Sequence, residues 1–523
     1  MQDKYDVIII GSGPAGAHCA YPLVKGDLKI AMLDGGIISP NQNLEERFTE
    51  NFEETRSTRN DQYELFLGKE LRNIVPEKEK SHVVSMTSGN KEYVIKNIEK
   101  TPTIADGVQI IQTLAKGGLS EAWSSACDVF DNDELQQIGI PSNDMHENYQ
   151  EVIDRIGLAG QCDGLKTMNG IELDSHAKKI LETFETKIKK NSHYNLKPSA
   201  LALVTRKFKN REPINYKDLD FFLNTGNTIY RSRFTIEELE NDTNFSYIPN
   251  QIVYKIEKAG QERVVFSKNN IDNTEQKYTA KYIILCAGAI NTSRILLKSF
   301  KLENKKVPFL TKTHFIIPTL RIKSLGLKDD TKKCSLTQLF LIDKRRKNNM
   351  ARSFSQLISY KSLLLNKLTR YMPLPTPEAI TILSLLAPSM VSIDIKFPST
   401  SEDSGYAYLD EKNTIHIHGD EHKKSFYRKE LWGIKMLLLK LGLLPLKTVS
   451  NPFGSTAHYA GGAPIDNKTS PLSTNSDCCL NQDNNIYIAD SATWRALPAK
   501  PPALTIMANA NRVAKILLRK IQK

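Results

Sequence analysis

The chain has 523 residues, of which 40% are hydrophobic and 25% carry a charge. This balance is typical of folded globular proteins and excludes a disordered chain, and the length predicts about two or three domains. The formal net charge is +12, but lysines and arginines are spread along the chain and form no nucleic-acid-binding module. Such dispersed charge is typical of a solvated surface. The alternative, attraction to a phosphorylated substrate or a membrane surface, stays open.

The seven cysteines are odd in number and include no CxxC pair. They predict neither a disulfide framework nor a zinc site, so we expect no metal and a reducing compartment. The sequence passes from MQDKY directly into an apolar run without the pattern of a signal peptide, and we expect a cytoplasmic protein. The uncharged stretch 379–393 is too short to span a bilayer. We expect it to be buried, and the functional alternative is a membrane-proximal or lipid-linked substrate.

The first forty residues predict a dinucleotide-binding unit. A β-branched apolar run ends at Ile10, the glycine turn GSGPAG follows, and a helical segment leads into a second buried strand that ends on Asp34. Gly11 permits the tight turn, Gly13 lets the backbone approach a pyrophosphate, and Gly16 allows close packing of helix on strand. Asp34, 18 residues after Gly16, is placed to accept hydrogen bonds from ribose hydroxyls.

Further along, residues 113–131 combine two glycines and small hydroxyl residues with one tryptophan, which indicates backbone packed against something flat. Residues 245–257 and 263–267 predict strands of a meander. Residues 281–299 predict a buried strand, a small-residue turn and a helix, in which Ala287 and Gly288 leave space for a ligand. The looser pattern of residues 311–447 indicates a different domain.

The C-terminal part holds a candidate acid/base. His458 lies among glycines and small residues, so a substrate can approach it. Histidine is also the side chain whose ordinary pKa is nearest neutrality, which suits proton transfer. After it the sequence predicts a strand ending at Asp490, a proline-rich loop, and a long helix from about Ala503.

Five segments, in this order, resemble the signature segments of glucose-methanol-choline (GMC) flavoprotein oxidoreductases: GSGPAG with Asp34, KGGLSEAW, CAGAINTSRILL, HYAGG and IYIADSATWRALPAKPPALTIMANANRVA. The likeness covers roughly half of the chain. GGLSEAW is most similar to pyranose-oxidase-like members, and HYAGG to the cholesterol-oxidase branch.

The resemblance implies an α/β fold with a discontinuous Rossmann-like FAD-binding domain and an inserted α+β substrate domain built on an antiparallel sheet. The expected FAD-binding parts are residues 1–160, 215–310 and 448–523. The expected substrate-binding parts are residues 161–214 and 311–447.

The resemblance also implies roles for single residues. The glycine turn would hold the FAD pyrophosphate, Asp34 the adenosine ribose and Asp490 the ribityl-pyrophosphate portion, with Val253 near the adenine and the 117–124 loop along the flavin. His458 matches the family's catalytic histidine. The expected cofactor-binding residues are Gly11, Gly13, Pro14, Ala15, Gly16, Asp34, Gly117, Gly118, Ser120, Trp123, Ser124, Val253, Ala287, Gly288 and Asp490.

Two positions depart from the family pattern. Ala122 stands where pyranose oxidase has a histidine linked to the flavin, so FAD is expected to be held non-covalently. Pro501 stands where many members have a second histidine or an asparagine, and proline has neither a side-chain donor nor an N–H. His458 then works alone or is helped by another group. Lys500 and Arg495 are the nearest candidates in sequence.

The expected activity is oxidation of an alcohol, with His458 taking the hydroxyl proton while a hydride passes to flavin N5. The pyranose-oxidase-like loop favours a sugar or other polyhydroxy substrate, which could be phosphorylated or lipid-linked, with O2 or another electron acceptor. Two alternatives stay open. One is a non-redox lyase that binds FAD in the same fold, and the other is a basic, membrane-associated binding protein.

Overall fold

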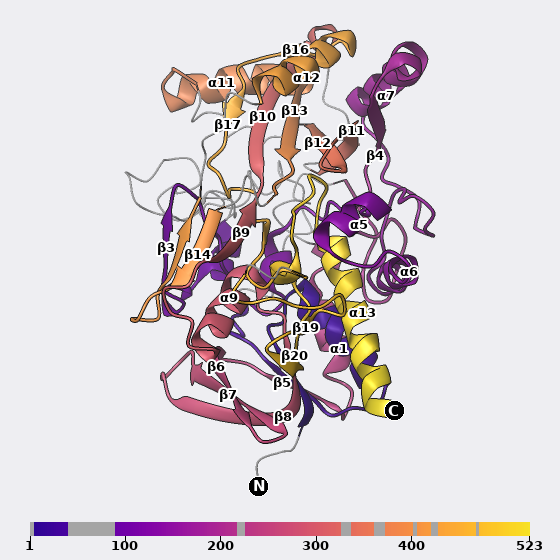
Figure 1. Ribbon diagram of the computed structural model, residues 1–523. Coiled ribbons are helices and arrows are strands. Elements are labelled where there is room, and N and C mark those ends of the chain that lie inside the picture. Colours follow the sequence, from indigo (N-terminus) through magenta and orange to yellow (C-terminus); the bar gives the residue numbers. More distant parts are fainter. Residues whose placement is uncertain are drawn as a thin grey trace.

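The computed structural model describes residues 5–39, 89–216, 225–325, 336–359, 372–400, 405–419, 427–466 and 470–523. Over these residues the chain forms three sheets with helices packed on them (Figure 1). The lower half of Figure 1 is a Rossmann-like α/β unit on a parallel sheet, and the upper half is built on a separate antiparallel sheet. The predicted fold class is therefore confirmed.

The parallel sheet has β1 (Tyr5–Ile10) and β8 (Glu275–Leu285), whose last four residues are buried and apolar, at its centre. Its strands lie in the order β20 (Asp483–Ile488), β8, β1, β2 (Ile30–Leu33) and β5 (Phe245–Ile248). The short β19 (Cys479–Leu480) pairs antiparallel with β20 at the edge. The predicted meander is also present, because β6 (Gln251–Ala259) pairs antiparallel with β7 (Glu262–Asn269), which pairs antiparallel with the first half of β8.

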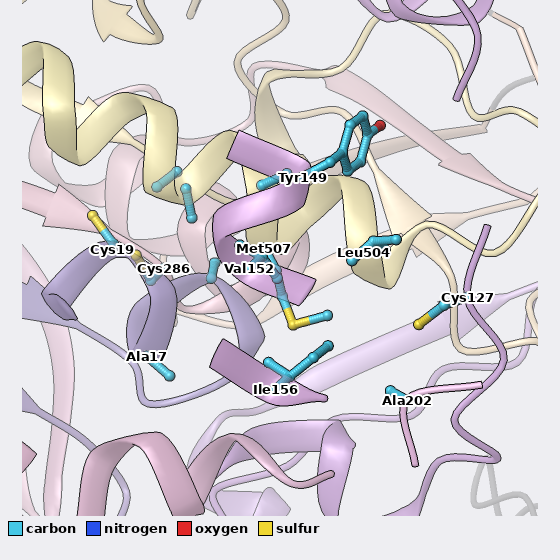
Figure 2. Close-up of a cluster of buried hydrophobic side chains, with 14 of the residues drawn as sticks. Ala17, Cys19, Cys127, Tyr149, Val152, Ile156, Ala202, Cys286, Leu504 and Met507 are labelled. Carbon is cyan, nitrogen blue, oxygen red and sulfur yellow. The ribbon is translucent and has the colours of Figure 1, made fainter. Parts of the chain in front are cut away.

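Helices cover both faces of this sheet, which explains why β1 and β8 are apolar on both faces. On one face lie α1 (Pro14–Lys25), α13 (Ala503–Gln522) and α6 (Met145–Ile156). On the other face lies α9 (Gly288–Ser299). Figure 2 shows how Val152 and Ile156 of α6 meet Leu504 and Met507 of α13 in the larger core.

The second sheet is antiparallel throughout. Its strands lie in the order β16 (Leu444–Pro445), β10 (Thr313–Leu320), β13 (Met390–Phe397), β12 (Met350–Ser359), β11 (Thr337–Lys347) and β4 (Tyr194–Pro198), with β17 (Val449–Ser450) also paired to β10. Two helices, α7 (Ser175–Lys187) and α12 (Arg428–Lys440), pack on one face through a shared apolar core. Because side chains alternate along a strand, the other face is built from the intervening residues.

A third sheet joins the two halves. Its strands lie in the order β18 (Tyr459–Ala460), β9 (Val307–Thr311), β14 (Gly405–Leu409), β15 (Ile415–His418) and β3 (Thr103–Asp106). This sheet shares an apolar core with α9 and the parallel sheet. The domain boundaries drawn from the sequence stay a prediction, although residues 161–214 do supply α7 and β4 to the second sheet.

The remaining helices are short and lie at the edges of these layers. The α-helices are α5 (Asn132–Ile138), α8 (Ser232–Leu239) and α11 (Thr376–Leu386). The 3-10 turns are η2 (Gly89–Ile95), η3 (Ile98–Lys100), η4 (Gly118–Ala122), η5 (Lys189–Asn191), η6 (Thr225–Asn227), η7 (Ile322–Ser324), η9 (Ala387–Ser389) and η11 (Ser491–Thr493). No helix within the described ranges is long and apolar enough to cross a bilayer.

The uncharged stretch 379–393 divides between two environments. Its second half enters β13, where Ile393 is fully buried in the core of the antiparallel sheet. Its first half lies on α11, where Leu383 is buried but Ile382 and Leu385 are 38% and 72% exposed. The expectation that this stretch is buried throughout is therefore wrong for its helical half, because α11 packs against the end of the sheet along one side only.

Packing of α13 against α6 and α1 should contribute measurably to stability. Leu504 is fully buried in this core, so Leu504→Ala should lower the free energy of unfolding by about 2–5 kcal/mol. The midpoint of urea denaturation measures this change. The matched substitution Leu439→Ala, on the exposed side of α12, should change it by less than about 0.5 kcal/mol. Equal effects of the two substitutions would contradict this placement of the core.

Candidate functional site

The glycine turn after β1 forms an open cradle. Gly11 has a φ of +101°, and Gly13 precedes the first residue of α1, where no side chain caps the helix. A Cβ built on Gly16 would lie 1.9 Å from the Gly11 carbonyl oxygen, so this glycine is required for packing. A Cβ on Gly13 would meet only the Cα of Gly118, at 3.9 Å. The space beside Gly13, at an uncapped helix N-terminus, is therefore open to an anionic ligand.

The two-glycine loop predicted near a cofactor folds onto this cradle. Gly117 and Gly118 both have a positive φ, and the Gly117 N–H donates to Ser12 Oγ at 2.9 Å. A Cβ on Gly118 would approach the Cα of Gly13 to 2.8 Å, so the two backbones meet without side chains between them. Residues that lie far apart in the sequence thus form one glycine-lined surface.

The rest of the 117–124 loop is held by hydrogen bonds to Tyr230 and Ser232. Ser120 accepts a hydrogen bond from the backbone N–H of Ser232 at 2.9 Å and donates to the Gly117 carbonyl oxygen at 2.6 Å. Trp123 donates from Nε1 to the Tyr230 carbonyl oxygen at 2.7 Å. These bonds fix Ser120 and Trp123 as supports of the loop, and Ser124 follows at its half-buried end.

Asp34 stands at the end of β2, as predicted. Its carboxylate accepts hydrogen bonds from the Ser12 and Gly36 backbone N–H groups at 3.0 and 2.9 Å and from the Tyr247 hydroxyl at 2.9 Å. These bonds fix the carboxylate at the end of β2, beside the glycine turn. The Asp34 carbonyl oxygen also accepts from Gln251, which places the start of β6, where Val253 lies, beside this acid.

Asp490 follows β20 and binds the turn of small residues, Ala287 and Gly288, at the start of α9. Its carboxylate accepts from the Gly288 N–H at 2.9 Å, the Thr292 hydroxyl at 2.6 Å and the Ala492 N–H at 2.9 Å. Burial raises the pKa of Asp490 to about 6 despite these bonds. A Cβ on Gly288 would meet no atom within 4 Å, so open space adjoins the turn that includes Ala287.

These features fit a dinucleotide. Gly13 and Gly288 each leave open space, the N-terminus of α1 is uncapped, and an acid stands at the end of β2. No comparable fit exists for a metal, because no group of three metal-binding side chains lies within the described ranges.

His458 lies in the turn before β18, above the parallel sheet. Its backbone N–H donates to Thr456 Oγ1 at 3.4 Å, and its ring Nδ1 is buried without a hydrogen-bond partner among the described residues. Burial, followed by the positive charges of Lys312 and Lys396, lowers the pKa of His458 well below its usual value, against the opposing effect of Asp394. The imidazole is therefore neutral at pH 7, as a proton acceptor must be.

Strand register brings Lys312 to His458. Tyr459 of β18 pairs antiparallel with Thr311 of β9, so the residues next to this pair, His458 and Lys312, leave the ladder at the same end. The charge of Lys312 is also the largest charge effect on the pKa of His458. These two residues are far apart in the sequence, and no motif links them.

The Nζ of Lys312 is fixed by the proline-rich loop. Lys312 is fully buried, and its Nζ donates to the carbonyl oxygens of Lys500 and Ala499 at 2.7 and 3.3 Å. Burial, and then the charge of Lys396, lower the pKa of Lys312 well below its usual value. The two carbonyls belong to the residues directly before Pro501. The loop that lacks a side-chain donor at position 501 thus holds a lysine instead.

The face of the antiparallel sheet opposite α7 and α12 carries a polar cluster beside this pair. His314 of β10 lies opposite Lys396 of β13, and Asp394 lies opposite Gln356 of β12. Lys396 donates to Asp394 at 2.6 Å and also to Gln356, while His314 binds Asp394 through Nε2 and Asn451 through Nδ1. Burial alone would raise the pKa of Asp394, but Lys396 and His314 outweigh it and hold this pKa below its usual value.

Lys500 and Arg495, the helpers proposed from sequence proximity, have other contacts. The Lys500 Nζ lies 2.8 Å from a carboxylate oxygen of Glu134 and 3.6 Å from one of Asp131, and it donates to a backbone carbonyl at 3.1 Å. Arg495 is exposed and donates to a backbone carbonyl of α5. In the structure, therefore, Lys500 and Arg495 bind α5 and its N-terminal turn, and a role for Lys500 in catalysis finds no support in its contacts.

Sequence reasoning missed Lys312, His314, Asp394 and Lys396. A usable signal was present in VSIDIKF, where charged residues alternate with apolar ones inside a strand. Such alternation indicates that one face of the strand lines a polar cavity. The lysine within VPFLTKTHFII is a second signal, because an unpaired cation in a buried strand needs a function or a partner.

Two cysteines lie behind the glycine cradle. Cys19 of α1 and Cys286, directly after β8, are both buried free thiols and lie side by side in Figure 2. Burial, and then the neighbouring Cys19, raise the pKa of Cys286 well above its usual value. A buried thiol with a raised pKa is a poor nucleophile, which argues against Cys286 as a reactive thiol.

The cradle yields a paired prediction. Gly13→Ala should leave the melting temperature nearly unchanged but lower the cofactor content of the purified protein, because its methyl group fills only the open space. Gly16→Ala should instead lower the melting temperature, because its methyl group meets the Gly11 carbonyl oxygen. Thermal denaturation, together with chromatography of the heat-released cofactor, separates the two effects. Full cofactor content in Gly13→Ala would exclude this glycine from the binding surface.

Residues 5–112 match the family model for pyridine nucleotide-disulphide oxidoreductases. No curated protein matches the chain. The matched segment holds β1, α1 and β2 but contains one cysteine, Cys19, so the similarity concerns the dinucleotide unit rather than a disulphide centre. The match and the geometry of the cradle together support an oxidoreductase with a Rossmann-like domain for FAD or NAD(P).

Proposed function

We propose that this protein is an FAD-dependent oxidoreductase of the GMC type that oxidises an alcohol group, with His458 as the proton acceptor. The observation that carries the proposal is a neutral imidazole with an unpartnered buried nitrogen, next to Lys312 and a polar sheet face. When bound, FAD supplies the hydride acceptor. It would be held by the glycine cradle, Asp34 and Asp490, and non-covalently, since Ala122 offers no atom for a covalent link.

The role of His458 follows from its protonation state. A base is effective only when it is unprotonated, and the lowered pKa of His458 keeps it so at neutral pH. The free ring nitrogen accepts the proton of the substrate hydroxyl. The surrounding cations then disfavour a long-lived imidazolium, so the proton is readily passed on.

Lys312 supplies the hydrogen-bond donor that Pro501 lacks. In alcohol oxidation, negative charge develops on the substrate oxygen as its proton leaves. The buried Lys312 Nζ, held in place by two carbonyl oxygens, can donate a hydrogen bond to that oxygen without reorganising, because its position is set before the reaction. We assign Lys312 the part played in other family members by the second histidine or asparagine.

The polar sheet face favours a substrate rich in hydroxyl groups. His314, Gln356, Asp394 and Lys396 together offer both donors and acceptors on one surface. Sugars and other polyhydroxy compounds use both kinds of partner, whereas a sterol offers one hydroxyl on an apolar body. The electron acceptor is O2 or another oxidant.

The first test measures reduction of the flavin by substrate without oxygen, using a screen of sugars, sugar phosphates, sugar nucleotides and simple alcohols. Reduction by one of them should be slowed by about a hundred- to ten-thousand-fold in His458→Ala, while the cofactor content stays unchanged. His146→Ala, on an exposed position of α6, is the matched control and should reduce at the normal rate. An unaltered rate in His458→Ala would overturn the assignment of the base.

The second test uses pH. Since Lys312 lowers the pKa of His458, Lys312→Met should raise that pKa. The rate of flavin reduction in the wild type should stay constant down to at least pH 6.5 and decline only below it. In Lys312→Met the decline should begin at higher pH, and the maximal rate should fall as well.

A shift of this pH profile distinguishes an electrostatic effect of Lys312→Met from a structural one. A substitution that merely loosened the fold would lower the rate at all pH values without moving the decline. An unshifted pH profile in Lys312→Met would therefore remove Lys312 from the site.

A further inference from the structure

The exposed apolar residues gather at one end of the molecule. Of twelve large hydrophobic side chains exposed within the described ranges, nine lie in residues 322–325, 374–385 and 432–444. We call these nine side chains the apolar cap. Six of them lie on α11, α12 and β16, which form the end of the antiparallel domain farthest from both chain termini (Figure 1). Scattered exposed hydrophobics need no explanation, but a gathering of this kind indicates a binding surface.

The clearest part of the cap is a second apolar stripe on α12. Trp432, Met436 and Leu439 follow one another at spacings of four and three, so they lie on one side of the helix. They are 66%, 38% and 46% exposed. A different side of α12, which includes Ile434 and Leu438, packs into the core of the antiparallel domain. The outward stripe is therefore not required for packing of α12 on the sheet.

Positive charge surrounds the cap. Residues 321–325, 374–386 and 428–447 contain seven lysines and arginines but only two acids. One of these acids, Glu430, is buried and pairs with Arg352. No described carboxylate pairs with Lys435 or Lys440 on α12, so their charges remain available to a partner.

The positive charge around the cap favours an anionic bilayer over a second copy of this chain as the partner. A second copy of this chain, packed cap to cap, would bring the two sets of cations together, and like charges oppose such an interface. An anionic bilayer instead meets both features, because it accepts exposed apolar side chains and attracts lysine and arginine. Tryptophan, the most exposed residue of the stripe, also favours the membrane–water interface.

We infer that the apolar cap docks the protein on the surface of an anionic lipid bilayer. β10 runs from His314, in the polar cluster, to Leu320 at the cap, a distance of about 20 Å at 3.3 Å per residue. Docking would therefore hold the candidate site above the headgroups rather than inside the bilayer. This inference does not depend on the proposed reaction.

The test is sedimentation of the full-length protein with vesicles of phosphatidylcholine alone or mixed equally with phosphatidylglycerol. The protein should sediment with the anionic vesicles and much less with the neutral ones.

The double variant Trp432→Ser, Leu439→Ser should bind at least about tenfold more weakly, because two apolar side chains that enter the bilayer are lost. Lys435→Glu, Lys440→Glu should also weaken binding by about tenfold or more. Ile271→Ser, at a 75% exposed position of the β7–β8 turn, is the control and should bind normally.

Tryptophan fluorescence provides a second readout. Trp494 is buried and Trp123 half-buried, so Trp432 is the tryptophan that vesicles can reach. Anionic vesicles should shift its emission to shorter wavelength, and Trp432→Phe should abolish the shift. Each variant is first shown to retain the wild-type circular dichroism spectrum.

Two results would overturn the inference. One is sedimentation that is absent, or equal in the wild type and in both double variants. The other is a dimer in analytical ultracentrifugation that Trp432→Ser, Leu439→Ser dissociates, since a second copy would then cover the cap.

Discussion

A short antiparallel pair, β9 with β18, determines the geometry on which the candidate site depends. It pairs Tyr459 with Thr311 and so brings the flanking residues His458 and Lys312 to the same end of the ladder. β9 also leads directly into β10 of the antiparallel sheet, and β18 follows the turn that carries His458. A shift of this pair by one residue would turn one of the two side chains to the opposite face. The site therefore exists only when both halves of the molecule are docked together.

The charges that act on His458 are unusual for a catalytic histidine, because most of them are positive. Catalytic histidines are often paired with a carboxylate that raises the pKa, but the nearest charges acting on His458 include two lysines. Asp394, which could offset them, is itself bound by Lys396 and His314. The net result is an imidazole that resists protonation. Such a group stays unprotonated at neutral pH but is a weak base, so removal of a hydroxyl proton depends on other groups that stabilise the charge developing on the substrate oxygen.

The sequence predicted the dinucleotide unit well, because its signals are local. A strand, a glycine turn, a helix and an acid at a fixed distance describe one continuous βαβ unit, and β1, α1 and β2 occur as expected. The strand before Asp490 and the helix from Ala503 were likewise predicted from continuous segments. The burial of residues 379–393 was predicted less well, since hydrophobicity alone cannot show which side of α11 faces the sheet.

The electrostatic partner of His458 could not be predicted in the same way. Proximity in sequence favoured Lys500, yet the backbone of this loop points carbonyl oxygens toward Lys312 while the Lys500 side chain extends to Glu134. The pairing of β9 with β18 is non-local, and its register is set by packing of two sheets rather than by any motif. What the sequence does retain is the alternation of charged and apolar residues in VSIDIKF, which indicates a polar face without identifying what that face meets.

The antiparallel sheet thus separates two surfaces of different character along the same strands. Near the parallel-sheet unit, β10 and β13 carry His314, Asp394 and Lys396 on the face opposite α7 and α12. At their far ends the same strands reach Leu320 and Met390, which pack beneath α11 and the exposed apolar residues. A rigid sheet of this kind fixes the distance between the two surfaces, because neither can move along a hydrogen-bonded strand relative to the other. If one surface binds a membrane, the height of the other above that membrane is set by strand length alone.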